Sequence, residues 1–521
     1  MKKNLSRRDF LKLVSLLPLT SIRLPSNEIF RVEEKSNNDK HNVIIIVYDT
    51  MSARNLSLYG YPRRTTPNLE RFAKQATVFH AHYSAANFTT PGISSLLTGT
   101  YPWTHRAINL QGLIKRGHEE FNLFRLFGPS FYRLAFSQNL FADLLLFQFE
   151  NEIDHHVKMG SFSLFHHMDF DGVFKRDAII AYKGLNDFML NTWETPGSMF
   201  VSRLEEAKIK YLWKTMMSEY GQLFPRGVPS HIYYNYYFLL EKIIDGAISI
   251  LNDIVFPALI YLHFYPPHES FFLKADPEMI YTPRKEFIGI FNEYIKTDTK
   301  QASFYTEGYT PEYLSRKQLE YDEYIAYTDS EFNRLYQFLE VSGFLENSYV
   351  VVTSDHGQLF ERGVHGHSNP YLYEPLIQVP LLIHKPGQKT REDIFSITSS
   401  VDLLPTLLDV IGRPIPDECE GELLPGFGGY ANVERSIFAV EAKSNPANRP
   451  LRLATLAMRK GRYKIIYYTG YPDYNDRSEL YDLQNDPDEL IDISNSNQVI
   501  VEDMKAELKN QLKQADARYS G

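Results

Sequence analysis

Carboxylates and a histidine follow two runs of β-branched residues that lie far apart in the 521-residue chain. Asp49 ends the stretch VIIIVYDT, and Asp355 and His356 lie in TSDHG. Carboxylate oxygens and an imidazole nitrogen are suitable ligands for one divalent cation, and the imidazole favours Zn²⁺ or Mn²⁺ while Ca²⁺ stays possible. A hydroxyl coordinated to such a cation is acidified and becomes a nucleophile.

A hydroxyl comes from the stretch NFTTPGISSLLTG, in which Thr89 and Thr90 precede Pro91. Proline suits the first position of a helix, so one interpretation of Thr89 is a helix cap. The other is a nucleophile, because the amides at a helix N-terminus favour negative charge. This stretch alone leaves both interpretations open.

Further histidines lie in PPHES, which contains His268, and in GVHGHS, which contains His365 and His367. His268 and His367 could contact a leaving group, or they could bridge backbone groups as imidazoles commonly do. We expect His365 to have a structural role. The doublets at 155–156 and 166–167 have no further ligand type near them, so we expect packing or solvated roles.

Strands that end at one edge of a sheet must position these groups. HNVIIIVYDT predicts a buried parallel strand with Asp49 at its C-terminal end. SEFNRLYQFLEVSGFLENSYVVVTSDHG predicts a helix, a glycine stop and a second strand that delivers Asp355. Ligands of open α/β sheets bind at this edge, so we expect the two carboxylates to meet there.

Outside these elements the chain changes in character. Residues 107–256 are dense in Phe, Tyr and Leu with periodic segments of helical length, which predicts a helical insertion within a catalytic domain at 41–428. In the range 429–521 a hairpin-like pair is followed by an amphipathic helix, which predicts a small α+β subdomain.

Composition excludes several classes of protein. A hydrophobic content of 43% with 23% charged residues is ordinary for a globular protein. The net charge of -9 and the lack of a Lys/Arg cluster beyond the N-terminus argue against nucleic acid as a partner. The single cysteine, Cys419, excludes an intramolecular disulfide and any multi-cysteine metal site.

The segment 1–30 resembles a bacterial twin-arginine export signal. Arg7 and Arg8 lie in SRRDFLK, and an apolar run too short to span a bilayer follows. The resemblance implies recognition by the twin-arginine translocase and an extracytoplasmic protein. No small-x-small cleavage site follows, so the segment could remain as a membrane anchor.

From about residue 41 to the end, the chain resembles the sulfatase branch of the alkaline phosphatase superfamily. The resemblance is carried, in the order of the family, by VIIIVYDT with LYGY and TTPNLERFA, TTPGISSLLTGTYP, LHFYPPHE, YDEYIAYTD, TSDHG, LYEP with VPLLIHKPG, and VDLLPTLLDVIG. It implies a three-layer α/β/α sandwich around a mixed, mostly parallel sheet.

The resemblance also implies roles for single residues. Asp49 matches the first metal-binding aspartate of the family, and Asp355 and His356 match the metal-binding pair of the second strand. Thr89 lies where sulfatases have the cysteine or serine that is oxidised to formylglycine, which makes it the nucleophile as well as a metal ligand. His268 matches the histidine of the PHxPY-like loop.

His367 falls near the family's leaving-group lysine or histidine, but other positions depart from the sulfatase pattern. Threonine cannot become formylglycine, whereas a threonine ester of phosphate can be hydrolysed by attack at phosphorus. Thr50 replaces a second metal aspartate, and Ile93 replaces an arginine. AFSQNLFAD stands roughly where a GKWHLG-like block binds sulfate, so the sequence favours phosphate esters over sulfate esters.

Together these features predict an exported, metal-dependent hydrolase of anionic phosphate or sulfate esters that acts through a covalent Thr89 intermediate. One alternative is a transferase of the phosphoethanolamine or glycerol-phosphate type, which would use the same site. The other is a sulfatase-like protein that has lost catalysis and binds a glycan or lipid. The sequence leaves the substrate and the oligomeric state open.

Overall fold

The computed structural model describes residues 41–164, 200–224, 227–231, 236–269, 271, 300, 302–517 and 519. The predicted export segment 1–30 and the histidine doublet 166–167 lie outside these residues.

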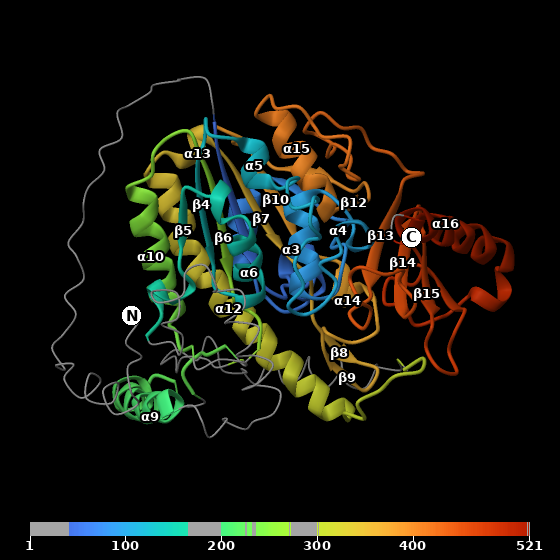
Figure 1. Ribbon diagram of the computed structural model, residues 1–521, viewed down its shortest axis with the longest axis horizontal. Coiled ribbons are helices and arrows are strands. Elements are labelled where there is room, and N and C mark those ends of the chain that lie inside the picture. The colour runs from blue at the N-terminus through green and yellow to red at the C-terminus, as the bar shows by residue number, and fades with distance from the viewer. Residues whose placement is uncertain are drawn as a thin grey trace, which may run out of the picture. The chain divides into compact units, whose positions relative to one another are not determined.

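An eight-stranded sheet forms the centre of the described chain (Figure 1). Five neighbouring strands are parallel to one another, while β10 runs antiparallel to both β7 and β2. The mixed, mostly parallel sheet predicted from the sequence is therefore confirmed. In spatial order the strands are β11 (Glu392–Ile394), β2 (Thr77–Phe79), β10 (Leu381–His384), β7 (Ser348–Ser354), β1 (Asn42–Tyr48), β6 (Ala258–Phe264), β4 (Tyr132–Ser137) and β5 (His155–Val157).

Strand β1 explains why the sheet is covered on both faces. All of its residues are buried, because alternate side chains enter two different apolar clusters. Ile44 and Ile46 pack against one layer of helices: α2 (Pro67–Ala73), α10 (Leu240–Asn252), α12 (Pro311–Val341) and α13 (Phe344–Asn347). Val43, Ile45 and Val47 pack against the other: α3 (Thr89–Thr98), α5 (Leu123–Phe127), α6 (Leu140–Gln148) and α15 (Leu403–Val410). This is the predicted three-layer sandwich.

The range 107–256 differs from the helical insertion expected there. It contains β4 and β5, which extend the central sheet beyond β6, together with α6, which packs on that sheet. The strand sequence YRLAFS is short and is followed at once by helical periodicity, so its period-2 pattern is hard to see. The described remainder of this range includes the helices α9 (Phe200–Tyr220) and α10.

The C-terminal part forms a second, antiparallel sheet (Figure 1, red). Its strands are β13 (Ser436–Glu441), β14 (Ala454–Lys460), β15 (Tyr463–Thr469) and β16 (Arg477–Asp482). Helix α16 (Gln498–Ala517) packs on this sheet through Val501, Met504 and Leu508. Here the predicted hairpin and final amphipathic helix are both present.

Smaller elements complete the described chain. They are the paired strands β3 (His82–Tyr83) with β12 (Thr398–Ser399) and β8 (Leu359–Glu361) with β9 (Val364–Gly366), the short helices α4 (Pro102–His105) and α14 (Glu374–Ile377), and the 3₁₀ turns η1 (Ala53–Asn55), η2 (Ser57–Tyr59), η3 (Glu150–Glu152), η4 (Met159–Phe162), η6 (Ser400–Asp402) and η7 (Ser494–Ser496). Within the described residues, no helix combines the length and the apolar character needed to cross a membrane.

Candidate active site

The predicted carboxylates meet because β1 and β7 are parallel neighbours in register. Tyr48 pairs with Ser354, so Asp49 and Asp355 are the next residues of the two strands. Both side chains are fully buried at this edge of the sheet. The prediction that Asp49 and Asp355 lie together at this edge of the sheet is therefore confirmed.

Each of these carboxylates has one oxygen that accepts hydrogen bonds and one that accepts none in the described structure. Oδ2 of Asp49 accepts from the amide of Asn139, and Oδ1 of Asp355 accepts from the backbone N–H groups of Thr50 at 3.1 Å and His356 at 2.9 Å. Oδ1 of Asp49 and Oδ2 of Asp355 are the two oxygens that accept no hydrogen bond in the described structure. Burial raises the pKa of both carboxyls, and the charge of Asp355 raises the pKa of Asp49 further. A cation between these oxygens would compensate the burial of two negative charges.

His356 faces the same point. Its Nε2 lies 3.4 Å from Oδ2 of Asp355 and 3.7 Å from Oδ1 of Asp49. Its Nδ1 lies 2.9 Å from the carbonyl oxygen of Gly357, which can only accept, so Nδ1 carries the proton and Nε2 keeps its lone pair. Burial lowers the pKa of His356 to about 3, which keeps the ring neutral. This is the tautomer that a metal ligand requires.

His263 joins this group and was missed in the sequence. It lies on β6, the other neighbour of β1, and the ligand atoms of Asp49, His263 and Asp355 all lie within 4.8 Å of one another. Ser137 donates its hydroxyl proton to Asn139, so it accepts at 3.3 Å from Nδ1 of His263. Nε2 of His263 is buried without a hydrogen-bond partner in the described structure. The sequence signal that could have indicated His263 is a single histidine within the otherwise apolar strand ALIYLHF.

Thr89 is the first residue of α3, and its hydroxyl does not cap that helix. Phe88 is the N-cap residue, and α3 has no side-chain capping bond. Oγ1 of Thr89 instead lies 3.4 Å from Nε2 of His356 and accepts from the amide of Asn139 at 3.3 Å. The helix-cap interpretation is therefore wrong, and the hydroxyl points toward the carboxylates.

Direct backbone packing places α3 beside β7. A Cβ atom added at Gly92 would lie 2.6 Å from the carbonyl oxygen of Asp355, a contact that only glycine avoids. The hydroxyl of Ser84 donates to that same carbonyl. The first turn of α3 is thus fitted against the residue that supplies a carboxylate to the site.

Asn139 connects helix α6 with Asp49 and Thr89, and the sequence did not predict this role. It follows β4 and caps α6, because its Oδ1 accepts from the N–H of Phe141 at 2.8 Å. Its amide nitrogen donates to both Asp49 and Thr89. In the sequence it belongs to AFSQNLFAD, a stretch that departs from the sulfatase pattern and whose asparagine has no recognisable motif around it.

His268 and His367 lie next to this cluster. The ring centroid of His367 is 4.5 Å from that of His356 and 4.9 Å from that of His268. Nδ1 of His268 donates to the carbonyl of Glu269 at 2.9 Å, and Nδ1 of His367 donates to the side-chain oxygen of Gln358 at 2.7 Å. Both rings therefore have an unprotonated Nε2. Burial lowers the pKa of His268 to about 4 and that of His367 well below its usual value.

The other predicted histidines have structural partners. His365 forms an ion pair with Glu269, which joins the β8–β9 hairpin to the loop that carries His268. His156 is on β5 at the edge of the sheet, where its Nε2 lies 2.8 Å from Asp143. The contact of His365 is structural, as expected, whereas His156 does have a carboxylate beside it, which the sequence did not indicate.

Thr50, at a position where many sulfatases have an aspartate, adopts an unusual backbone conformation. Its φ of 61° is strained for a β-branched residue. The conformation is held by the hydroxyl of Tyr321, which donates to the carbonyl of Thr50 and accepts from the N–H of Ser52 at 3.0 Å. It directs the N–H of Thr50 to Asp355, so this residue contributes a backbone donor to the site.

Two family models match the chain. A model described as Sulfatase matches residues 41–413, and one described as N-sulphoglucosamine sulphohydrolase, C-terminal, matches residues 363–518.

Curated relatives match a shorter region. Arylsulfatase K of Canis lupus familiaris is 28% identical over 216 residues, which is 39% of this chain and 37% of the relative. Choline-sulfatase of Rhizobium meliloti (strain 1021) is 30% identical over 192 residues, covering 36% of this chain and 34% of the relative. The matches thus span little more than a third of the length of either relative.

Solved structures share the fold over almost the whole chain. The phosphonate monoester hydrolase of Agrobacterium radiobacter has a TM-score of 0.61 at 19% identity and covers 91% of this chain and 96% of its own. A protein solved in complex with its substrate D-glucosamine-2-N,6-O-disulfate has a TM-score of 0.58 at 17% identity, with 92% and 98% covered. At these identities the likeness establishes the fold.

Proposed function

Because the chain belongs to the sulfatase family, we propose that it is a metal-dependent hydrolase of anionic phosphate or sulfate esters in which Thr89 is the nucleophile. One observation carries this proposal: the Thr89 hydroxyl contacts His356 beside the buried carboxylates of Asp49 and Asp355. A hydroxyl, two acids and a neutral imidazole together form a nucleophile-and-metal arrangement.

The donor set fits one divalent cation. Two carboxylate oxygens and one imidazole nitrogen are buried without hydrogen-bond partners in the described structure, and burial of this kind is costly for groups that bind nothing. We propose Asp49, Asp355, His356 and Thr89 as ligands, with His263 as a further nitrogen donor. Two imidazoles favour Zn²⁺ or Mn²⁺ over Ca²⁺. When bound, the cation supplies positive charge that acidifies the hydroxyl and neutralises the ester oxygens.

Thr89 would act in two steps. In the first, its Oγ1 attacks the phosphorus or sulfur of the ester in line with the leaving oxygen, so that the bond from Thr89 forms while the ester bond breaks. In the second, water attacks the Thr89 ester and releases the inorganic or monoester product. Position 89 cannot become formylglycine, so release depends on attack at the central atom, which supports phosphate esters as substrates.

His268 and His367 would move the protons. Each begins with an unprotonated Nε2 in the cluster, so either can accept the proton of the attacking hydroxyl and pass it to the leaving oxygen. Burial disfavours their charged forms, whereas an anionic ester beside them would favour protonation. They would therefore hold a proton mainly while substrate is present.

We also propose that the protein is exported. The support is Arg7 and Arg8 in SRRDFLK, followed by a short apolar run. The twin-arginine translocase would be the partner, and the segment would either be removed or remain as an anchor. This route carries folded proteins, so the metal could be bound before export.

A substrate panel tests the hydrolase. Purified protein is assayed with an aryl sulfate, a phosphate monoester and a phosphodiester, each with Zn²⁺, Mn²⁺ or Ca²⁺, beside the Thr89→Ala variant. We expect turnover of a phosphate ester that depends on metal and is lost in the variant. Transfer to added glycerol or ethanolamine in place of water would indicate the transferase alternative. Metal binding without turnover of any ester would indicate a binding protein.

A further inference from the structure

Lys443 belongs to the C-terminal part of the chain, yet its side chain reaches the candidate active site. The residue follows β13, and its Nζ donates to the carbonyl oxygen of Ser368, the neighbour of His367 in the sequence. Burial lowers the pKa of the His367 imidazole, and nearby positive charges, that of Lys443 among them, lower it further. The ammonium group therefore lies within electrostatic range of a histidine that we propose moves protons.

The backbone around Lys443 is held from two sides. Asn109, which lies in the catalytic range, donates its amide N–H groups to the carbonyl oxygens of Lys443 at 2.7 Å and Asn445 at 3.0 Å. The buried amide of Asn445 in turn donates to the carbonyls of Ala442 at 2.9 Å and Leu453 at 2.6 Å. These bonds fix the start of the side chain, so the lysine is positioned before any ligand arrives.

The half-buried ammonium group of Lys443 forms no ion pair with the described residues. Burial lowers its pKa, and the charges of Glu441 and Glu307 offset this only in part. Both carboxylates have hydrogen bonds elsewhere: Glu441 accepts from the backbone N–H of Lys443 at 3.1 Å and from the hydroxyl of Tyr471 at 2.9 Å, and Glu307 accepts from the N–H of His365 at 3.1 Å. A bound anion would offset the cost of burying this charge.

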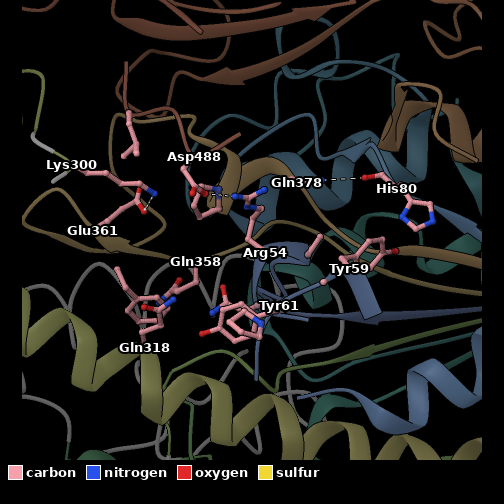
Figure 2. A pocket seen from close by; sticks show the side chains of 17 residues that line it. Arg54, Tyr59, Tyr61, His80, Lys300, Gln318, Gln358, Glu361, Gln378 and Asp488 are labelled. Carbon is pink, nitrogen blue, oxygen red and sulfur yellow. Dashed lines mark hydrogen bonds and ion pairs between the residues drawn. The ribbon is translucent and has the colours of Figure 1, made fainter. Parts of the chain in front are cut away.

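Cations in the polar pocket of about 370 Å³ that Figure 2 shows are arranged differently. Arg54 pairs there with Asp488, and Lys300 pairs with Glu361 at 2.6 Å. Each of these two cations has its own carboxylate, whereas Lys443 has none in the described structure. Lys443 is therefore the better candidate for binding an anionic group of a ligand.

We propose that Lys443 is a substrate-binding residue, which donates a charge-assisted hydrogen bond to an oxygen of the anionic ester group. This rests on the proposed function, because it names a residue that holds the substrate of the same site. One N–H of the ammonium group stays on Ser368, and the other two can reach ester oxygens. The stretch AFSQNLFAD contains no lysine or arginine, so the C-terminal part supplies this positive charge. It would stabilise the negative charge of the ester in the transition state.

Titration calorimetry of the zinc-loaded protein with inorganic phosphate tests this proposal without any turnover. Lys443→Met removes the charge, Lys443→Gln keeps an N–H donor for Ser368 without the charge, and Lys443→Arg keeps the charge. Lys460→Met is the matched control, because it removes one positive charge from the same sheet at a lysine that pairs with Glu507 at 3.0 Å. Melting temperature and metal content verify that each variant is folded and loaded.

We expect phosphate to bind about tenfold or more weakly in Lys443→Met and Lys443→Gln, while Lys443→Arg and Lys460→Met stay close to wild type. For the best ester substrate, KM should rise in the same two variants.

The proposal is overturned if phosphate does not bind the wild type, or if Lys443→Met binds it as tightly as the wild type. It is also overturned if Lys443→Gln keeps the affinity that Lys443→Met loses, because the lysine would then act only through Ser368. Lys443-dependent phosphate binding in a protein that hydrolyses no ester would contradict the hydrolase and support the anion contact. Turnover of an ester with unchanged phosphate affinity in both uncharged variants would do the reverse.

Discussion

The hydroxyl oxygen of Thr89 lies 3.4 Å from Nε2 of His356, although the two residues are 267 positions apart in the chain. One begins helix α3, and the other follows strand β7. The hydroxyl makes this contact in place of the capping bond that a threonine at a helix start commonly makes. Its orientation therefore serves the site and not the stability of the helix.

Thr89→Ala is expected to lower kcat by several orders of magnitude with little change in substrate binding, because a nucleophile bonds to substrate only from the transition state onward. Thr89→Ser should recover part of the rate, since it restores the hydroxyl but not the methyl group that restrains its rotamer. Steady-state kinetics on the best substrate measures this. Mass spectrometry of wild type with a slow phosphodiester should show a phosphoryl group on the peptide that contains Thr89.

Thr90→Ala is the matched control for this experiment, because the Thr90 hydroxyl donates to the carbonyl of Leu110 and not to any of the proposed metal ligands. It should lose stability by about 1 kcal/mol and keep most of its activity. A Thr89→Ala rate within tenfold of wild type would refute the assignment of Thr89 as the nucleophile.

One divalent cation per chain is expected in the purified protein. Asp355→Asn should abolish metal binding and activity together, since it removes one of two charged ligands. His263→Leu should weaken metal affinity without abolishing it, by roughly 10- to 100-fold if its nitrogen coordinates. Elemental analysis and competition with a chelating dye measure both. Full activity in metal-free protein would contradict the metal proposal. Unchanged metal affinity in His263→Leu would contradict only the assignment of His263 as a ligand.

Asn139→Ser separates the two roles of Asn139. Serine can still cap α6, but it is too short to reach Asp49 and Thr89. We expect the melting temperature to change little, while metal affinity and kcat fall by about tenfold or more. Asn139→Asp keeps the cap and the length but replaces the donor with a third acid, so it should also lose activity. Wild-type kinetics in both variants would show that this amide only packs.

Buried neutral histidines should make the protein sensitive to acid. Burial lowers the pKa of His82 to about 3, while an unfolded histidine titrates near 6.5. Between these values the unfolded chain binds more protons than the folded one, so the free energy of unfolding falls as the pH falls from about 6.5 toward 3.

His82→Gln isolates this contribution, because glutamine can keep a contact with Thr398, whose Oγ1 lies 3.0 Å from Nδ1 of His82. Between about pH 6.5 and pH 4 the variant should lose roughly 3 kcal/mol less stability than wild type. Urea unfolding at several pH values provides the measurement. Parallel pH dependence in the two proteins would contradict the assignment to His82.

Export is tested by changing Arg7 and Arg8 to lysine in the full-length chain. If the twin-arginine translocase recognises this segment, the variant should accumulate in the cytoplasm of the expressing bacterium. Cell fractionation with immunoblotting measures its distribution. Lys3→Arg, a change outside the SRRDFLK stretch, is the control. Wild-type distribution of the double variant would indicate another route.

Sequence patterns predicted those parts of the site that depend on strand ends. Val43 to Val47 and the strand before Asp355 are long apolar runs that stop at acids, and parallel neighbours necessarily bring such ends together. Helix α3 was equally clear, with Pro91 in its first turn and Gly99 at its end. Thr89 is not the cap because the helix begins at Thr89 itself, with Phe88 as the N-cap residue, and a helix boundary is not fixed to one or two residues by the sequence pattern.

The residues that were missed reach the site through the order of the strands. His263 enters because β6 pairs with β1, and Asn139 enters because β4 pairs with β6. Local periodicity does not reveal the spatial order of the strands in the sheet, and β4 itself lay within the expected helical insertion. A polar residue at the end of an unrecognised strand has no visible partner in the sequence.

The contact between Gly92 and the carbonyl of Asp355 has a consequence for substitutions at position 89. Steric constraint rests on position 92, where no side chain fits, while position 89 lies one helical turn away and has room for its hydroxyl. The first turn of α3 therefore packs against the end of β7 through its backbone, whatever side chain stands at position 89. An exchange of threonine for serine at position 89 therefore leaves the contact at Gly92 unchanged, so its effect on activity would report on the side chain alone.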